Sequence, residues 1–125
     1  MTDIFHDSLI LVGEYKPEFN SILQREIPCL KIYQSSGLKI HIKKSHSNVL
    51  QYLENIPEII LFPDFIGCHP KEDNSVEFVK CYEKNILLAV KLDMGKNYLY
   101  VASLYDVTDS KIQNRLNSGR LKKVN

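Results

Sequence analysis

The chain has 125 residues, a formal net charge of +1, 44% hydrophobic residues and 25% charged residues. This length and composition fit one globular domain over residues 1–125 and exclude the collagen-like and disordered classes. The longest apolar runs, at 59–62 and 86–90, are too short to cross a bilayer, and the first six residues lack the features of a secretory signal. We therefore expect a cytoplasmic protein without a membrane partner.

The first 33 residues predict a strand, a helix and a second strand. Residues 9–12 form a short apolar run, and Pro17 begins a segment with apolar side chains at helical spacing. Pro28 ends that helix, and residues 30–33 alternate as in a brief strand.

Two further helices are predicted before residue 64. In the segment 38–46, Leu38 and Ile42 lie four residues apart and place an apolar stripe beneath a basic face. The stripe repeats in a second helix that begins near residue 47, and Pro57 is expected to limit this helix.

From residue 64 the hydrophobic period changes from near 3.6 to near 2, which predicts strands. The turns between them are short, so consecutive strands should pair antiparallel. The four predicted strands span residues 65–68, 76–82, 85–92 and 98–105. A basic helix over 109–116 follows, with Thr108 as its N-cap and Gly119 at its end.

Together these elements predict an α+β fold. N-terminal helices would pack on a four-stranded antiparallel β-meander, and a short basic helix would close the chain. Strand alternation places Ala89 and Lys91 on one face of the third strand of the meander. The same alternation places Val101, Ser103 and Tyr105 on one face of the fourth strand.

The near-zero net charge conceals two basic stretches, at 39–46 and 111–123, while acids lie mostly elsewhere. Such an uneven distribution predicts an anionic partner that meets one face of the protein. The alternative is a pair of solvated helix faces.

The cysteines at 29, 68 and 81 form no CxxC pair, so we expect reduced thiols and neither a disulfide framework nor a zinc cluster. The neighbours Cys68 and His69 could bind a metal only with further ligands, which the sequence does not show. No cofactor is therefore expected.

Motifs for nucleotide, zinc-protease, serine-hydrolase and calcium sites are absent from the sequence. What remains is the stretch in which His41 and His46 flank Lys43 and Lys44. Imidazoles transfer protons near neutral pH and ammonium groups stabilise phosphodiester charge, so this pattern suits RNA cleavage without a metal, in which the 2′-hydroxyl is the nucleophile. Five residues turn a helix by about 140°, so the two imidazoles share one helix face poorly, although a helix end near His46 would turn that side chain round. The alternative is that both lie on a solvated helix.

Lys91 follows an apolar run on a predicted interior strand, so its charge should meet Glu77 across the sheet or a bound anion. Ser103 is either an ordinary sheet residue or a catalytic hydroxyl. Glu77 is a second candidate for a general base, because its neighbours Val76 and Phe78 point the other way.

Near the C-terminus, Lys111 and Arg115 lie on the basic helix, and Ser118, Gly119 and Arg120 offer a flexible backbone and a forked donor to a phosphate. The same pattern also fits an ordinary helix end before a basic tail.

A series of blocks in this chain, in order, resembles the phage-type Barnase-EndoU-colicin-RelE-like nuclease domains. These domains occur in polyvalent proteins of phages and mobile elements and in short stand-alone proteins of Gram-positive bacteria. The blocks are 41–46, 48–60, 63–67, 74–80, 85–93, 97–103, 110–112 and 118–123. The resemblance covers about residues 8–124. It implies helices packed on a four-stranded antiparallel sheet and metal-independent ribonuclease chemistry in a bacterial host cell.

Two positions differ from the related domains. Those domains often have an Arg before the histidine, where this chain has Ser45, and a Thr late in the last strand, where this chain has Ser103.

The first hypothesis is a ribonuclease for single-stranded or looped RNA, with His46 or His41 as general acid or base and Lys91 stabilising the phosphorane charge. Arg115 and Arg120 would hold flanking phosphates. The candidate catalytic residues are His41, His46, Lys91 and Ser103, and the candidate nucleic-acid-binding residues are Lys43, Lys44, Lys111, Arg115, Ser118 and Arg120.

The second hypothesis is a non-catalytic phage or mobile-element protein that binds a host protein or nucleic acid with the same scaffold. The missing Arg and the near-neutral charge favour it. A purely structural domain is a third reading. The expected partners are RNA and, for a toxin, an antitoxin or host protein, and the oligomeric state stays open.

Overall fold

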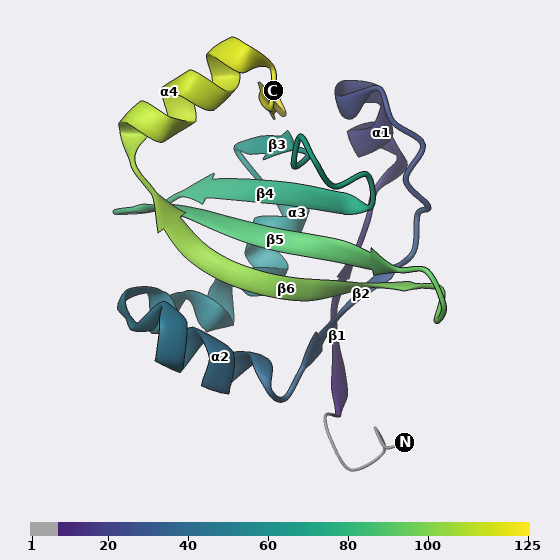
Figure 1. Ribbon diagram of the computed structural model, residues 1–125, viewed down its shortest axis with the longest axis vertical. Coiled ribbons are helices and arrows are strands. Elements are labelled where there is room, and N and C mark those ends of the chain that lie inside the picture. The colour runs from purple at the N-terminus through teal and green to yellow at the C-terminus, as the bar shows by residue number, and fades with distance from the viewer. Residues whose placement is uncertain (1–7) are drawn as a thin grey trace.

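The computed structural model describes residues 8–125 (Figure 1). Residues 1–6, which we expect not to form a secretory signal, lie outside this range. The first half contains β1 (Leu9–Glu14), α1 (Pro17–Leu23), β2 (Lys31–Ser35), α2 (Leu38–Ser45), the 3₁₀ helix η2 (Ser47–Asn55) and α3 (Ile56–Leu61). The second half contains β3 (Phe65–Gly67), β4 (Ser75–Cys81), β5 (Asn85–Asp93), β6 (Tyr98–Val107), α4 (Asp109–Ser118) and β7 (Leu121–Lys123).

All seven strands of the described chain join one sheet in the order β1-β2-β6-β5-β4-β3-β7. β2 pairs with β6 in parallel, with Ile32 opposite Leu99 and Tyr33 opposite Tyr100. The other neighbouring strands pair antiparallel. The sheet is therefore mixed.

The fold is α+β, but the predicted architecture is wrong. A strand, β1, comes first, the sheet has seven strands, and one of its pairings is parallel, so it is not a four-stranded antiparallel meander covered by preceding helices. Hydrophobic periodicity reports alternation within a segment, whereas β2 and β6 meet across more than half of the chain. The three-residue strand β7 looks like a basic tail in the sequence, because such a length carries no period.

Pro57 limits η2, as predicted, and it also begins the next helix. The segment before it, η2, has 3₁₀ geometry, and Pro57 lies in the first turn of α3, where its missing N–H has no helical partner to lose.

The predicted ends of α4 are confirmed. Thr108 Oγ1 accepts a hydrogen bond from the Lys111 backbone N–H at 3.1 Å, and Gly119 has the left-handed conformation, with φ of 86°.

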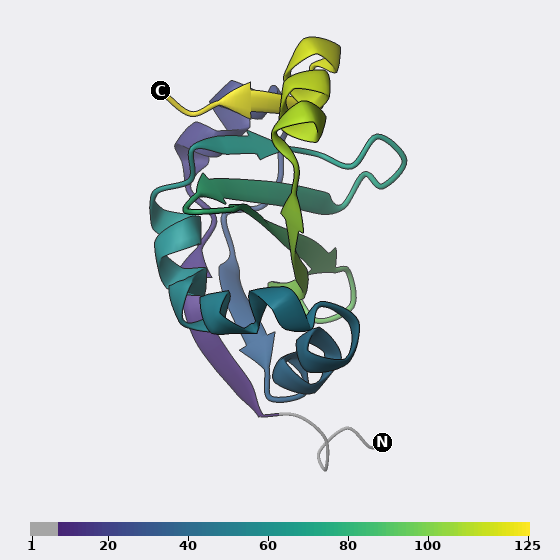
Figure 2. The ribbon, with the colours of Figure 1, turned by 90° about the vertical axis from the view of Figure 1, so that its left-hand side faces the viewer.

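The two faces of the sheet carry separate cores. The larger core packs side chains of α1, α2, η2 and α3, such as Phe19, Ile42 and Ile56, against strand residues that include Phe78 and Leu88. The smaller core lies under α4 and contains Val79, Leu87, Val107, Ile112 and Leu121. Figure 2 shows α3 on one side of the sheet and α4 on the other. No helix within residues 8–125 has the length and apolar character of a membrane span.

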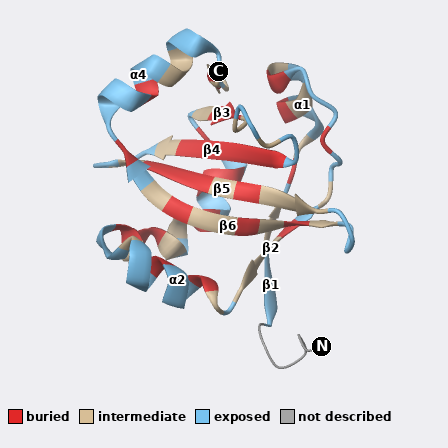
Figure 3. Cartoon of the chain, viewed as in Figure 1, coloured by how far each residue is buried: buried red, intermediate tan, exposed pale blue. Residues whose placement is uncertain are grey.

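One region of the sheet lies between two helices that cover only its margins. In Figure 1, α2 lies below β6 and α4 lies above β4, and Figure 3 shows that both helices expose their outer surfaces while β4 and β5 are mostly buried. We call the surface of β4, β5 and β6 between these helices the open face. Its central residues are Glu77, Ala89, Lys91, Ser103 and Tyr105.

A close approach between β3 and β7 generates the first prediction. A Cβ atom at Gly67 would lie 1.9 Å from the Arg120 carbonyl oxygen and 2.9 Å from Leu121 Cδ2, so Gly67→Ala must displace β7. We expect this variant to lose about 2 kcal/mol or more of unfolding free energy in denaturant titrations. Gly95→Ala is the control, since the nearest atom, Asp93 Oδ1, would be 3.6 Å from its Cβ. Equal stability of the two variants would contradict the close packing.

Candidate active site

A β-bulge in β6 determines which residues reach the open face. Ala89 pairs with Ser103, but the next residue, Val90, pairs with Val101, so Ala102 is an extra residue in β6. The prediction that Val101 shares a face with Ser103 is therefore wrong. Val101 is buried in the larger core, while Ser103 lines a pocket on the open face.

That pocket, the site pocket, has a volume of about 370 Å³. Side chains from α2, the β3–β4 loop and strands β4, β5 and β6 line it. The four predicted catalytic residues, His41, His46, Lys91 and Ser103, all line it. The fold therefore brings these residues together, although they are up to 62 positions apart in the sequence.

The end of α2 places its two histidines together. The helix ends at Ser45, and His46 leaves helical geometry with φ of −144° and ψ of 50°. The ring centroids of His41 and His46 are 6.0 Å apart. The His41 Nε2 atom lies 3.4 Å from Ser103 Oγ, and the His46 ring lies 5.6 Å from the Tyr105 ring. Both imidazoles thus contact β6 side chains at the edge of the site pocket.

A side-chain hydrogen bond anchors the segment that follows His46. Asn48 Nδ2 donates to Asp106 Oδ1 at 2.9 Å and joins the start of η2 to β6. This contact fixes the chain two residues beyond the His46 imidazole.

Lys91 is paired, but not with the predicted acid. Its Nζ atom lies 3.0 Å from Glu72 Oε1, in the β3–β4 loop, and Ser75 is its register partner on β4. An acid does meet Lys91, as one of the two alternatives expected, but it is not Glu77, which binds another cation. Hydrogen bonding to Lys91 lowers the pKa of Glu72 below its ordinary value. Both side chains are more than a third exposed, so the pair is weak and an incoming anion can compete for Lys91.

The strongest polar contact at the site joins Glu77 to Arg120. Glu77 is only 3% exposed, and Arg120 Nε and Nη2 donate to its two carboxylate oxygens at 3.0 and 2.7 Å. These hydrogen bonds raise the pKa of Arg120. A buried carboxylate requires such a partner, so this bidentate pair fixes the segment after α4 to β4.

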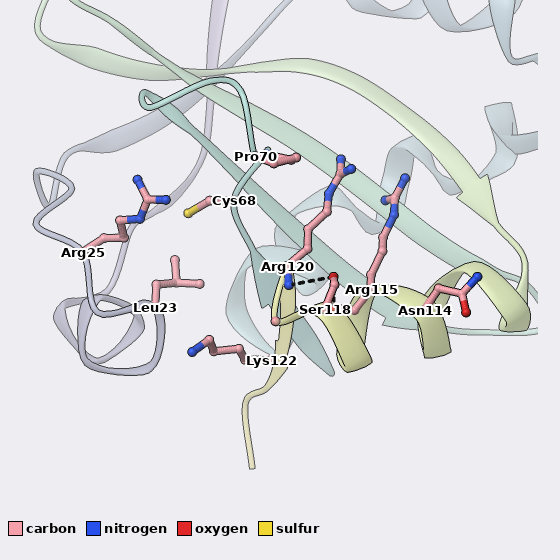
Figure 4. A pocket seen from close by; sticks show the side chains of 10 residues that line it. Leu23, Arg25, Cys68, Pro70, Asn114, Arg115, Ser118, Arg120 and Lys122 are labelled. Atoms are coloured by element: carbon pink, nitrogen blue, oxygen red, sulfur yellow. Dashed lines mark hydrogen bonds between the residues drawn. The ribbon is translucent and has the colours of Figure 1, made fainter.

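The predicted nucleic-acid-binding residues fall into two groups. Arg115, Ser118 and Arg120 line a second pocket of about 630 Å³, shown in Figure 4, which we call the basic pocket. The Ser118 hydroxyl is engaged in the helix end, where it donates to the Arg115 carbonyl and accepts from the Arg120 N–H. The other three residues are exposed on α2 and α4 and line neither pocket: Lys43, Lys44 and Lys111.

Sequence reasoning missed several side chains of the site pocket. His69 and Glu72 lie in a segment that the sequence marks as a turn. From the sequence, His69 is only a possible metal ligand beside Cys68, and no local pattern identifies Glu72. His69 Nδ1 accepts the Lys71 backbone N–H at 3.1 Å, which orients the ring. The strand period of two places Tyr105 on the face of Ser103, but Tyr105 is not among the candidate site residues named from the sequence.

The adjacent Cys68 and His69 are directed to different hollows. Cys68 lines the basic pocket and His69 lines the site pocket. Burial raises the pKa of the Cys68 thiol, and the nearby Arg25 opposes that shift. Among residues 8–125, no three His, Cys, Asp or Glu side chains are grouped as a metal site requires.

The Glu77–Arg120 pair generates the second prediction. Arg120→Met should leave a buried, unpaired carboxylate and cost about 2–4 kcal/mol of unfolding free energy, measured by denaturant titration. Adding Glu77→Gln to Arg120→Met removes that charge, so the double variant should be more stable than Arg120→Met alone. A double variant that is less stable would show that the carboxylate does not depend on its cation.

Comparison with known proteins gives one match. A family model described as phage-Barnase-EndoU-ColicinE5/D-RelE like nuclease3 matches residues 10–114. No curated protein and no solved structure matches the chain. The match spans most of the chain and both basic helices up to Asn114. The resemblance that the sequence blocks indicated is thereby confirmed, and the chain belongs to this family of phage-type nucleases.

Proposed function

We propose that the protein is a metal-independent ribonuclease that cleaves single-stranded or looped RNA by general acid–base catalysis. The observation that carries this proposal is the grouping of His41, His46 and His69 with Lys91 in one pocket of a chain from a nuclease family. Imidazoles beside a cation supply the proton transfers and the charge stabilisation that phosphodiester cleavage needs.

The proposed reaction uses the RNA itself as the nucleophile. One imidazole removes the proton from a 2′-hydroxyl, and the resulting oxygen forms a bond to the adjacent phosphorus. The bond from phosphorus to the 5′-oxygen of the next nucleotide breaks, and a second imidazole donates a proton to that oxygen. The products are a 2′,3′-cyclic phosphate and a 5′-hydroxyl end. Lys91 stabilises the negative charge that develops on the phosphate oxygens.

In-line attack requires the base and the acid on opposite sides of the phosphate. His41 and His46 approach the site pocket from α2, over β6, whereas His69 approaches from the β3–β4 loop. We therefore assign one proton transfer to the α2 histidines and make His69 a candidate for the other. Ser103 orients His41 through their 3.4 Å contact.

Cations around the pockets would bind the rest of the RNA. Arg115, beside the Ser118 turn, holds a phosphate that flanks the scissile one. Arg120, the other expected phosphate ligand, is occupied by Glu77 and keeps this segment in place. The exposed Lys43, Lys44 and Lys111 contribute sequence-independent attraction to the backbone.

The decisive experiment is incubation of total RNA with purified protein in EDTA, followed by end-group analysis. We expect fragments with 2′,3′-cyclic phosphate, and a loss of about 100-fold or more in rate for His46→Ala, His41→Ala or Lys91→Ala, because acid–base and electrostatic contributions are of this size. His69→Ala tests the second proton transfer. Lys31→Ala, on the exposed surface of β2, is the control and should cleave like the wild type. Undiminished cleavage by all of the pocket variants would refute the assignment.

A second candidate function is binding without catalysis, to a host protein or nucleic acid. One observation favours it: Lys91 already contacts Glu72. RNA that remains intact in the experiment above, under every condition, would support this function over the ribonuclease.

The Lys91–Glu72 pair generates a further prediction. Glu72→Gln removes the charge that competes with phosphate for Lys91, so RNA with 2′-O-methyl groups, which cannot be cleaved, should bind several-fold more tightly with a steeper salt dependence. Because Lys91 lowers the pKa of Glu72, their pairing persists to a lower pH than it would for an unshifted glutamate and is lost as the pH falls through that lowered pKa. Glu54→Gln, on the exposed surface of η2, makes the same charge change away from the pocket. Equal affinities for the two variants would show that Glu72 does not restrain Lys91.

A further inference from the structure

The basic pocket is lined by cations from three separate segments. Arg25 follows α1, Arg115 lies on α4, and Arg120 and Lys122 lie in the turn after α4 and in β7. None of the described residues that line this hollow is acidic. Figure 4 shows the Arg115 and Arg120 side chains extending in the same direction, with Arg25 beside Cys68. The volume of about 630 Å³ is within the range of small-ligand sites.

The positive charge of this pocket is only partly neutralised. Arg120 is bound to Glu77, which lies on the site-pocket side. Arg115 Nη1 is buried and has no hydrogen-bond partner among the described residues. A buried charged donor without an acceptor is costly, and cations that converge on one hollow repel each other. An anion in the pocket would relieve both costs.

The basic pocket and the site pocket are neighbours. Glu77 lines the site pocket while its partner Arg120 lines the basic pocket, so one ion pair separates them. The loop after β3 separates them in the same way, since Cys68 lines one hollow and His69 lines the other. A single polyanionic strand can therefore occupy both hollows by crossing the Glu77–Arg120 pair.

We propose that the basic pocket is a distinct phosphate subsite that binds an internal phosphodiester of the RNA strand whose scissile phosphate lies in the site pocket. This inference rests on the proposed ribonuclease function and deepens it. Arg25, Arg115 and Lys122 supply the contacts, because the forked donors of Arg120 already bind Glu77. The subsite makes the preferred substrate an oligonucleotide longer than a dinucleotide.

The test is fluorescence anisotropy with 2′-O-methyl oligonucleotides of two and eight nucleotides, which bind but cannot be cleaved. The ratio of the octamer affinity to the dimer affinity should fall about tenfold in the double variant Arg25→Gln/Lys122→Gln, since each lost phosphate contact weakens binding and reduces the salt slope by about 0.7. Lys31→Gln removes an exposed charge from β2 and should leave the ratio unchanged. Thermal unfolding of the double variant checks that it remains folded.

The outcomes separate this inference from the proposed function. An unchanged ratio and salt slope in the folded double variant would overturn the subsite even if the wild type cleaves RNA, and the pocket would then fit an acidic protein surface instead. A tenfold fall in the ratio would support the subsite even if the wild type leaves RNA intact in EDTA. Failure of the wild-type protein to prefer the octamer over the dimer would also overturn it.

Discussion

The open face depends on one buried ion pair, between Glu77 and Arg120. A carboxylate that is 3% exposed at the centre of a sheet must have a cation, and this cation comes from the far end of the chain. Arg120 reaches Glu77 because Gly119 turns the chain out of α4 and because Gly67 has no Cβ to hold β7 away from β3. The last segment, which looks like a basic tail in the sequence, is therefore a structural part of the site.

The extra residue in β6 lets that strand contribute side chains both to the larger core and to the site pocket. Leu99, Val101 and Leu104 are buried in the larger core, while Ser103 and Tyr105 must face the site pocket. Strict alternation would place Val101 and Ser103 on the same face. The bulge at Ala102 changes the alternation between these two residues, which lets one strand both close the core and contact the α2 histidines.

Local sequence patterns predicted the strands and the candidate catalytic residues, but not the strand pairings and ion pairs that join them. The period of two located β4, β5 and β6, and the basic stretch ending at His46 located the histidines, so the four candidate catalytic residues could be named from sequence. The parallel pairing of β2 with β6, the strand β7 and the partner of Lys91 could not be predicted. Each of these three features depends on a contact between segments that are far apart in the sequence. Hydrophobic periodicity and composition are local properties and do not predict such contacts.

The acidic partners of the cations differ between the two pockets, which indicates a different role for each pocket. The site pocket is lined by two acids, Glu72, which pairs with Lys91, and Glu77, so acids moderate the positive potential where the scissile phosphate would lie. In the basic pocket no lining residue among those described is acidic. Most of the binding energy would thus come from phosphates remote from the reaction. These contacts would hold the scissile phosphate against the imidazoles. Contacts there that strengthen in the transition state would accelerate cleavage. A chain with a net charge of only +1 can bind a polyanion in this way, because Arg25, Arg115 and Lys122 line one hollow that has no acidic lining residue among those described.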